Sequence, residues 1–256
     1  MLRIFQSSQS VDELLQSTKS HFREIYAIRR GRLTEKEINE MLRKLRRAAN
    51  VEEATVALKA LYKPLDQSSE KNLRKDSADK IARFDGVGNS LIALEKWHAQ
   101  SQEFSYMTFQ LLIRISFFVP STKTFIVNSG GILTIIEAVR AHEENGAQDE
   151  YLFKSSALGL LTNLSLEVDD AIKAEVASEE CLDLVLECMK RWPEKEYAQK
   201  RGCIYFYEVG QIDEVKDMMH EKRVGMPIID ALDRFRDSNK DVWKWASQAL
   251  VVYSRS

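Results

Sequence analysis

The chain has 256 residues, of which 44% are hydrophobic and 30% are charged, with a formal net charge of −2. This composition is typical of a folded globular protein and excludes wholesale disorder. No stretch reaches the roughly 20 uncharged apolar residues of a membrane span, and the N-terminus lacks the apolar core of a secretory signal. Few prolines and glycines, with abundant Leu, Ala, Lys, Glu and Arg, favour helices.

The three cysteines are an odd set without the C-x-x-C spacing of metal and redox sites. We expect Cys181, Cys188 and Cys203 to be free thiols, most of them buried, in a reducing compartment. The expected location is therefore the cytoplasm or the nucleus, and the sequence indicates no cofactor and no metal.

The first 76 residues have helical patterns without a glycine corner. Thr34 and Glu37 form a capping box that opens one of these helices, and Pro64 ends the last of them. We predict that residues 1–63 form an N-terminal helical cap or a divergent repeat, and that the polar residues 64–76 form a linker or long loop. The three apolar stripes run from Val11 to Ile25, from Ile38 to Leu45 and from Val51 to Leu61.

A pair of glycines, Gly130 and Gly131, stands directly before a one-sided apolar stripe that runs from Ile132 to Val139. Glycine in a helix interior costs roughly 1 kcal/mol relative to alanine. The pair therefore predicts a sharp reversal between two helices.

This corner recurs along the chain. The residues around Gly86 align with those around Gly130 after a shift of 44 residues, and Glu180 and Gly225 then take the place of Gly131. Each corner is preceded by a short helical piece and followed by two helices, of which the second is longer. We predict four units of three helices within residues 77–256, at about 77–120, 121–166, 167–211 and 212–256.

The long third helix of each unit carries a small residue at the same place, which close approach of a neighbouring helix explains. These residues are Thr108, Ala157, Gly202 and Ala246.

Three helices per roughly 44 residues, with glycine at the first corner, resemble the armadillo repeat. The clearest match runs from Ser121 to Ser165, and ends in the family's A-L-x-x-L-x-N-L-S pattern. The resemblance covers about residues 77–256 and implies an all-α, right-handed solenoid. HEAT repeats, with two helices per unit, are the nearest structural alternative.

The resemblance also implies a concave groove, lined by third helices, that holds a peptide or a partner helix. The family's peptide readers place asparagine near the end of the third helix, with tryptophan one turn earlier. Here only Asn163 matches the asparagine and no tryptophan precedes it, so a reader of basic extended peptides is not favoured. The expected groove residues are Met107, Gln110, Arg114, Ser156, Asn163, Arg201, Ile204, Glu208, Trp245 and Gln248.

Trp245 is the expected aromatic anchor, because an aromatic ring buries much area at low entropic cost. A tryptophan in the last unit is also explained by packing against the preceding helix, and both interpretations stay open.

Charge is unevenly distributed, with a net +6 over residues 1–84 and −8 over residues 85–256. A basic N-terminal patch either is a solvated helix face or docks on an acidic partner, a phosphate or the acidic half of another copy. Nucleic acid is not favoured, because no aromatic residues interleave with these arginines. The patch comprises Arg29, Arg30, Arg32, Arg43, Lys44, Arg46 and Arg47.

Signatures of catalysis are missing from the sequence: no nucleophile elbow, zinc-protease helix, P-loop or dinucleotide fingerprint occurs. His98 and His142 fall at equivalent places just past a second helix, where a histidine favours the helix dipole. We therefore expect a protein-interaction module or scaffold that is not an enzyme. The alternative is a regulatory or assembly subunit that associates through its basic N-terminal helices, as a homo-oligomer or on an anionic surface.

Overall fold

The computed structural model describes residues 33–66, 69–143 and 150–255, and these residues are helical, without a strand. The prediction of an all-α fold is therefore confirmed. No helix of the described ranges is long and apolar enough to cross a membrane. The helices predicted within residues 1–32 lie outside the described residues.

Two antiparallel helices begin the described chain. The capping box is present, since Glu37 N donates to Thr34 Oγ1 at 3.2 Å and Thr34 N donates to Glu37 Oε2 at 2.7 Å. The second helix ends where Pro64 enters a 3-10 turn, as the sequence predicts. The elements are α2 (Glu35–Arg47), α3 (Val51–Tyr62) and η1 (Lys63–Leu65).

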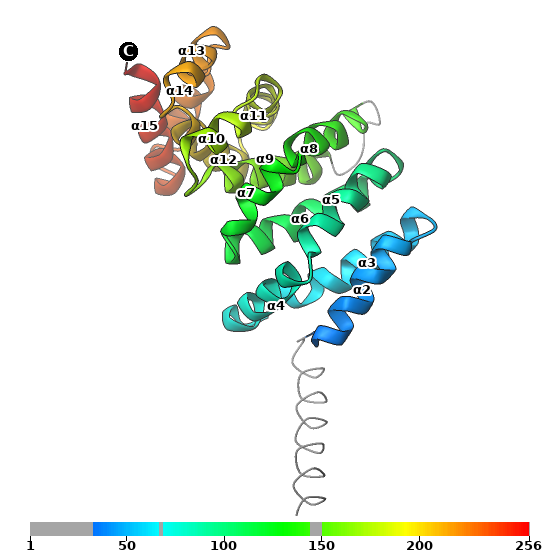
Figure 1. Cartoon of the computed structure of the whole chain (residues 1–256). Helices are drawn as coiled ribbons and strands as arrows, with labels where there is room; N and C mark the ends of the chain where they lie inside the picture. The colour runs from blue at the N-terminus through cyan, green and yellow to red at the C-terminus, as the bar shows by residue number, and fades with distance from the viewer. Residues whose placement is uncertain (1–32, 67–68, 144–149, 256) are drawn as a thin grey trace, which may run out of the picture.

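Four triplets of helices follow, and Figure 1 shows them succeeding one another in chain order, away from α2 and α3. The first two triplets are α4 (Lys71–Arg83), α5 (Gly86–Trp97), η2 (His98–Gln100) and α6 (Gln102–Phe118), then α7 (Ser121–Asn128), α8 (Gly131–Arg140) and α9 (Glu150–Ser165). The last two are α10 (Asp170–Val176), α11 (Glu179–Arg191) and α12 (Glu196–Val209), then α13 (Asp213–Glu221), α14 (Gly225–Arg234) and α15 (Lys240–Ser254).

The third helices contact one another in sequence order, from α3 to α6, α9, α12 and α15. Second helices also meet across triplets, at α2 with α5, α5 with α8, and α11 with α14. The pair α2 and α3 therefore packs as the second and third helices of the later triplets do. Helix α9 lies in the middle of the row, and every residue from Phe153 to Ser165 is buried.

The glycine pair forms the predicted reversal between two helices, α7 and α8. Gly130 adopts a left-handed φ of 76° between α7 and α8, which glycine adopts without strain. A Cβ on Gly131 would lie 2.6 Å from the carbonyl oxygen of Ile126, so this position admits no larger residue.

The first corner aligns differently from the sequence prediction. Gly86 begins α5 as Gly131 begins α8, and its added Cβ would also lie 2.6 Å from a carbonyl oxygen, that of Ile81. The left-handed residue here is Asp85, with φ 59°. Gly86 is thus the equivalent of Gly131, and the shift is 45 residues, not 44. The sequence alignment matched glycine to glycine, whereas the backbone places an aspartate where Gly130 stands.

The predicted linker at residues 64–76 is also corrected. Helix α4 begins at Lys71, inside the segment expected to be a loop. Leu73, Ser77 and Ile81 form a buried stripe at four-residue spacing, and the lysines of the segment stay on the outer face. The short helical piece expected before the first corner is therefore longer than predicted. The polar composition concealed its first turns, because the buried face contains only one large apolar residue before position 77.

Candidate functional site

A hollow of about 290 Å³ opens on the face made by the third helices α6, α9 and α12. Helical spacing explains its walls: Tyr106, Gln110 and Ile113 follow one another at i, i+4 and i+7 on α6, and Tyr197 and Arg201 at i and i+4 on α12. The lining residues are Tyr106, Gln110, Ile113, Arg114, Tyr151, Leu152, Ser155, Ser156, Tyr197 and Arg201.

The charge of the hollow comes from two arginines, and none of its described lining residues is acidic. The guanidinium of Arg201 lies over the Tyr197 ring, 5.3 Å from its centroid, which is a cation–π contact. Arg114 Nε is a buried atom without a hydrogen-bond partner. The hollow is therefore positive, within a half of the chain whose net charge is negative.

The floor of the hollow is held by hydrogen bonds between helices. Gln110 Nε2 donates to Ser156 Oγ at 3.1 Å, and that hydroxyl donates to the Leu152 carbonyl oxygen at 2.8 Å. These bonds fix the amide of Gln110 between α6 and α9.

Aromatic rings form the rest of the wall. The Tyr151 ring packs edge to face against the Trp192 ring, with 5.2 Å between the two centroids. Lys195 Nζ lies 5.4 Å from the centroid of the Tyr151 ring. Burial raises the pKa of the Tyr151 phenol. A Cβ on Gly159 would lie 2.3 Å from the Tyr197 hydroxyl oxygen, so glycine at this place on α9 allows the tyrosine to cover it.

Four of the ten predicted groove residues line this hollow: Gln110, Arg114, Ser156 and Arg201.

Two others are buried inside the helix row. Asn163 is 5% exposed, and its Nδ2 donates to Ser116 Oγ at 2.6 Å, so this amide joins helices and does not face solvent. Ile204 is 6% exposed. The expectation of an accessible Asn163 is corrected, because the neighbouring helix places a serine hydroxyl against it.

The remaining four lie apart from the hollow. Glu208 pairs with Lys173 on α10 at 3.1 Å, and Trp245 packs edge to face on Tyr207 at a centroid distance of 5.7 Å. Trp245 on α15 therefore packs against the preceding third helix, α12, which is the second of the two interpretations of this residue. Met107 and Gln248 are both half-buried.

Sequence reasoning missed the three tyrosines of the hollow. Tyr106 and Tyr197 each stand one helical turn before a predicted groove residue, Gln110 and Arg201 respectively. This four-residue spacing was the available signal. Tyr151 opens α9 in a segment whose start the sequence did not define.

The basic N-terminal patch is described only in part, since Arg29, Arg30 and Arg32 lie outside the described residues. The four members on α2 are exposed, and Lys44 pairs with Glu40 at 2.9 Å. Three of them border a hollow between α2 and α3 together with Glu52, Glu53 and Val56; the described members of the patch are Arg43, Lys44, Arg46 and Arg47.

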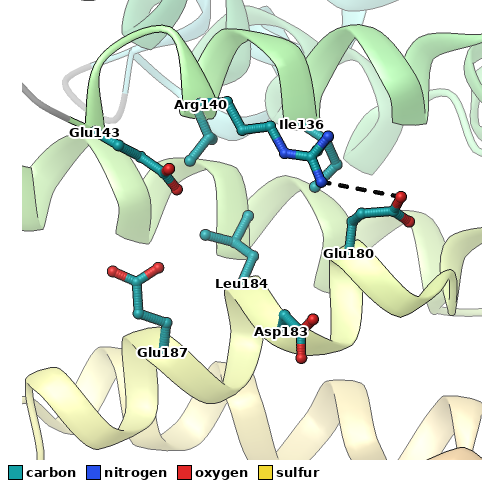
Figure 2. Close-up of a pocket in the computed structure, with 8 residues that line it drawn as sticks. Ile136, Arg140, Glu143, Glu180, Asp183, Leu184 and Glu187 are labelled. Atoms are coloured by element: carbon teal, nitrogen blue, oxygen red, sulfur yellow. Dashed lines mark ion pairs between the residues drawn. The ribbon is translucent and has the colours of Figure 1, made fainter.

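A third hollow, between α8 and α11, has four acidic side chains in its lining (Figure 2). Its acidic side chains are engaged by cations: Arg140 reaches Glu180 at 3.9 Å, and Lys222 reaches Asp183 at 2.7 Å. Apolar side chains lie among these groups. The lining residues are Ile136, Val139, Arg140, Glu143, Glu180, Asp183, Leu184 and Glu187.

The three cysteines and His142 are buried and contribute to the packing of the helices. Burial raises the pKa of each of the three cysteine thiols to about 12. His142 Nε2 lies 2.7 Å from the carbonyl oxygen of His98, so the two equivalent histidines join successive triplets. Within the described ranges, no group of three or more His, Cys, Asp and Glu is placed to hold a metal ion.

Comparison with known proteins adds information on the fold alone. No family model matches the chain, and no curated protein matches it in sequence. A crystal structure of an engineered protein from the Northeast Structural Genomics Consortium is similar, with a TM-score of 0.61 and 15% sequence identity. The likeness covers 84% of this chain and 78% of that one. An all-helical row of this kind thus occurs in a solved structure.

Proposed function

We propose that the chain is an armadillo-like helical solenoid that binds a partner's peptide segment on the face of its third helices. The observation that carries this proposal is the hollow across α6, α9 and α12. Three consecutive third helices contribute to it, and it joins two arginines that form no ion pair with described residues to exposed apolar groups. Leu152 is 50% exposed and Tyr197 is 43% exposed, which leaves apolar area for a ligand to cover.

The spread of the hollow over three helices suits a peptide. Pockets for drug-sized ligands measure about 300 to 1,000 Å³. A volume of about 290 Å³ is at the lower end of that range and accommodates one or two side chains of a longer segment. The partner is then a protein, and the role of the chain is that of a scaffold or adaptor with no chemistry of its own.

Random-peptide display on the full-length protein tests this function without an identified partner. The double variant Leu152→Ala/Tyr197→Ala removes apolar surface from the hollow and no charge. It therefore weakens binding of an acidic, neutral or basic peptide alike. We expect peptides selected on the wild type to bind this variant at least about tenfold more weakly, because each truncated contact contributes about 1 kcal/mol or more. Equal affinity for both proteins would place the binding surface elsewhere.

The runner-up is assembly through the basic face of α2, and a specific observation favours keeping it. Arg43, Arg46 and Arg47 are exposed and form no ion pair with described residues. A second copy or another anionic surface would meet these arginines. Arg43→Gln/Arg46→Gln/Arg47→Gln removes these charges and leaves α2 packed on α5. Molar mass measured by light scattering, at low and high salt, should fall in this variant if the alternative is correct, and an unchanged molar mass would contradict it.

A further inference from the structure

We propose that the segment bound in the α6–α9–α12 hollow is acidic: an Asp or Glu carboxylate pairs with Arg114 and Arg201, beside a large apolar residue. The inference rests on the proposed function and names the chemistry of its ligand.

The two arginines are unusual for their half of the chain. Most buried or half-buried cations there have carboxylate partners, such as Lys154 with Glu187 at 2.5 Å and Lys222 with Asp183 at 2.7 Å. The buried Lys123 is satisfied differently, since its Nζ donates to the Leu166 carbonyl oxygen at 2.7 Å. Arg114 and Arg201 form no ion pair with any described residue. Two guanidinium groups in one hollow that contains no carboxylate attract an anion from outside the chain.

Desolvation strengthens this attraction. A buried donor without an acceptor raises the free energy of the unbound protein, and Arg114 Nε is such a donor. The planar guanidinium offers its donors in a fork that matches both oxygens of a carboxylate. A ligand carboxylate that reaches the guanidinium of Arg114 would supply the ion pair that no carboxylate of the described chain provides.

The other walls indicate what surrounds that carboxylate. Leu152 and Ile113 offer apolar contact, and the exposed half of Tyr197 adds an aromatic face. Gln110 uses its Nε2 on Ser156, which leaves its Oε1 to accept a bond from a peptide N–H. An acidic residue adjacent to leucine or phenylalanine satisfies all of these groups together.

Arginine beside tyrosine would also suit single-stranded nucleic acid, but the surroundings favour a peptide. Binding to a phosphate backbone depends on many cations that track it. Residues 85–256 carry a net charge of −8, and the hollow offers two arginines. A local acidic residue is compatible with this field, whereas an extended polyanion is repelled by it.

The test uses peptide display on the full-length wild type, followed by anisotropy titrations of the selected peptides. Arg114→Gln/Arg201→Gln removes two charges from the hollow, and Arg43→Gln/Arg46→Gln removes two from the exposed face of α2 as a matched control. Circular dichroism melts verify that each variant folds. If Arg114→Gln/Arg201→Gln does not fold, Arg114→Lys/Arg201→Lys keeps the charge and loses only the bidentate geometry.

We expect selected peptides to be enriched in Asp or Glu next to Leu or Phe. Their affinity should fall at least about tenfold in Arg114→Gln/Arg201→Gln or its lysine substitute, and change less than about twofold in the control. If the selected peptides are neutral or basic but bind Leu152→Ala/Tyr197→Ala more weakly than the wild type, the proposal of an acidic ligand is wrong and the proposed function stands. Peptides indifferent to every hollow variant would contradict both. A single-stranded oligouridine that binds at the arginines more tightly than the acidic peptides would overturn the inference as well.

Discussion

Asn163 Nδ2 donates a hydrogen bond to Ser116 Oγ across 2.6 Å, and so joins the ends of two neighbouring third helices at positions 47 residues apart. The serine hydroxyl in turn donates to the carbonyl oxygen of Leu112 at 2.6 Å. Both side chains are buried, so this short chain of bonds holds α9 against α6 where water does not compete.

Asn163→Ala should therefore lower the free energy of unfolding by about 1 to 3 kcal/mol, because a buried hydrogen bond is lost and Ser116 loses its donor. Arg201→Gln, in the half-exposed hollow, should change it by less than about 0.5 kcal/mol. Urea denaturation followed by circular dichroism measures both. An Asn163→Ala protein as stable as the wild type would show that the bond contributes nothing.

Gly131→Ala should destabilise the chain by about 1 to 3 kcal/mol, because the new Cβ would lie 2.6 Å from the Ile126 carbonyl oxygen and the backbone must shift. Gly88→Ala is the matched control within a helix. There the nearest atom is the Asp85 Oδ1 carboxylate oxygen at 2.4 Å, on a side chain that can rotate away, and alanine gains helix propensity. Denaturation midpoints that fall equally for both variants would contradict this reading of the corner.

Tyr205→Phe should cost about 1 to 3 kcal/mol of stability. The Tyr205 hydroxyl donates to the Val176 carbonyl oxygen at 2.8 Å in the buried contact between α12 and α10, so phenylalanine leaves that carbonyl without this donor. Tyr207→Phe, on the same helix but half-buried, should be nearly neutral. Calorimetric melting of the two variants distinguishes them, and equal melting temperatures would refute the role of the Tyr205 bond.

Alkaline pH should weaken the fold through the cysteines. Burial raises the pKa of each thiol from 9.0 to about 12, so the unfolded chain ionises these groups first. The contribution of the protonated, buried thiols to the free energy of unfolding is fully present below pH 9, and it is lost as the pH rises from about 9 towards 12. Urea denaturation at pH 7 and pH 10 should therefore show a larger fall for the wild type than for the variant with all three cysteines changed to alanine. Equal falls would mean that the thiols do not contribute.

Much of the fold could be predicted because several helix boundaries have a local cause. The capping box at Thr34, the stop at Pro64 and the left-handed Gly130 are determined by a few adjacent residues. The start of helix α4 escaped prediction because its first turns are polar and its buried face is completed by Ser77 and Ala78, which contribute little to a hydrophobic pattern.

The site was harder to predict than the fold, because its accessibility depends on neighbouring helices. The repeat spacing in the sequence placed Asn163 and Arg201 on third helices. Only the packing of α6 beside α9 shows that Ser116 covers the asparagine. Similarly, Gly159 had no assigned partner in sequence, and the Tyr197 hydroxyl that lies against it comes from the next triplet. Such contacts join residues about 40 positions apart, and a single sequence contains no local pattern for them.

Methyl NMR of the full-length protein, titrated with a peptide selected by display, tests the central claim most directly. Ile113 and Leu152 line the α6–α9–α12 hollow, and Ile113 is half-buried there. Ile92 on α5 and Leu133 on α8 are exposed apolar residues on second helices and serve as controls. We predict that the methyl signals of Ile113 and Leu152 shift on binding while those of Ile92 and Leu133 stay unchanged. Shifts confined to Ile92 and Leu133 would contradict a docking surface on the third helices.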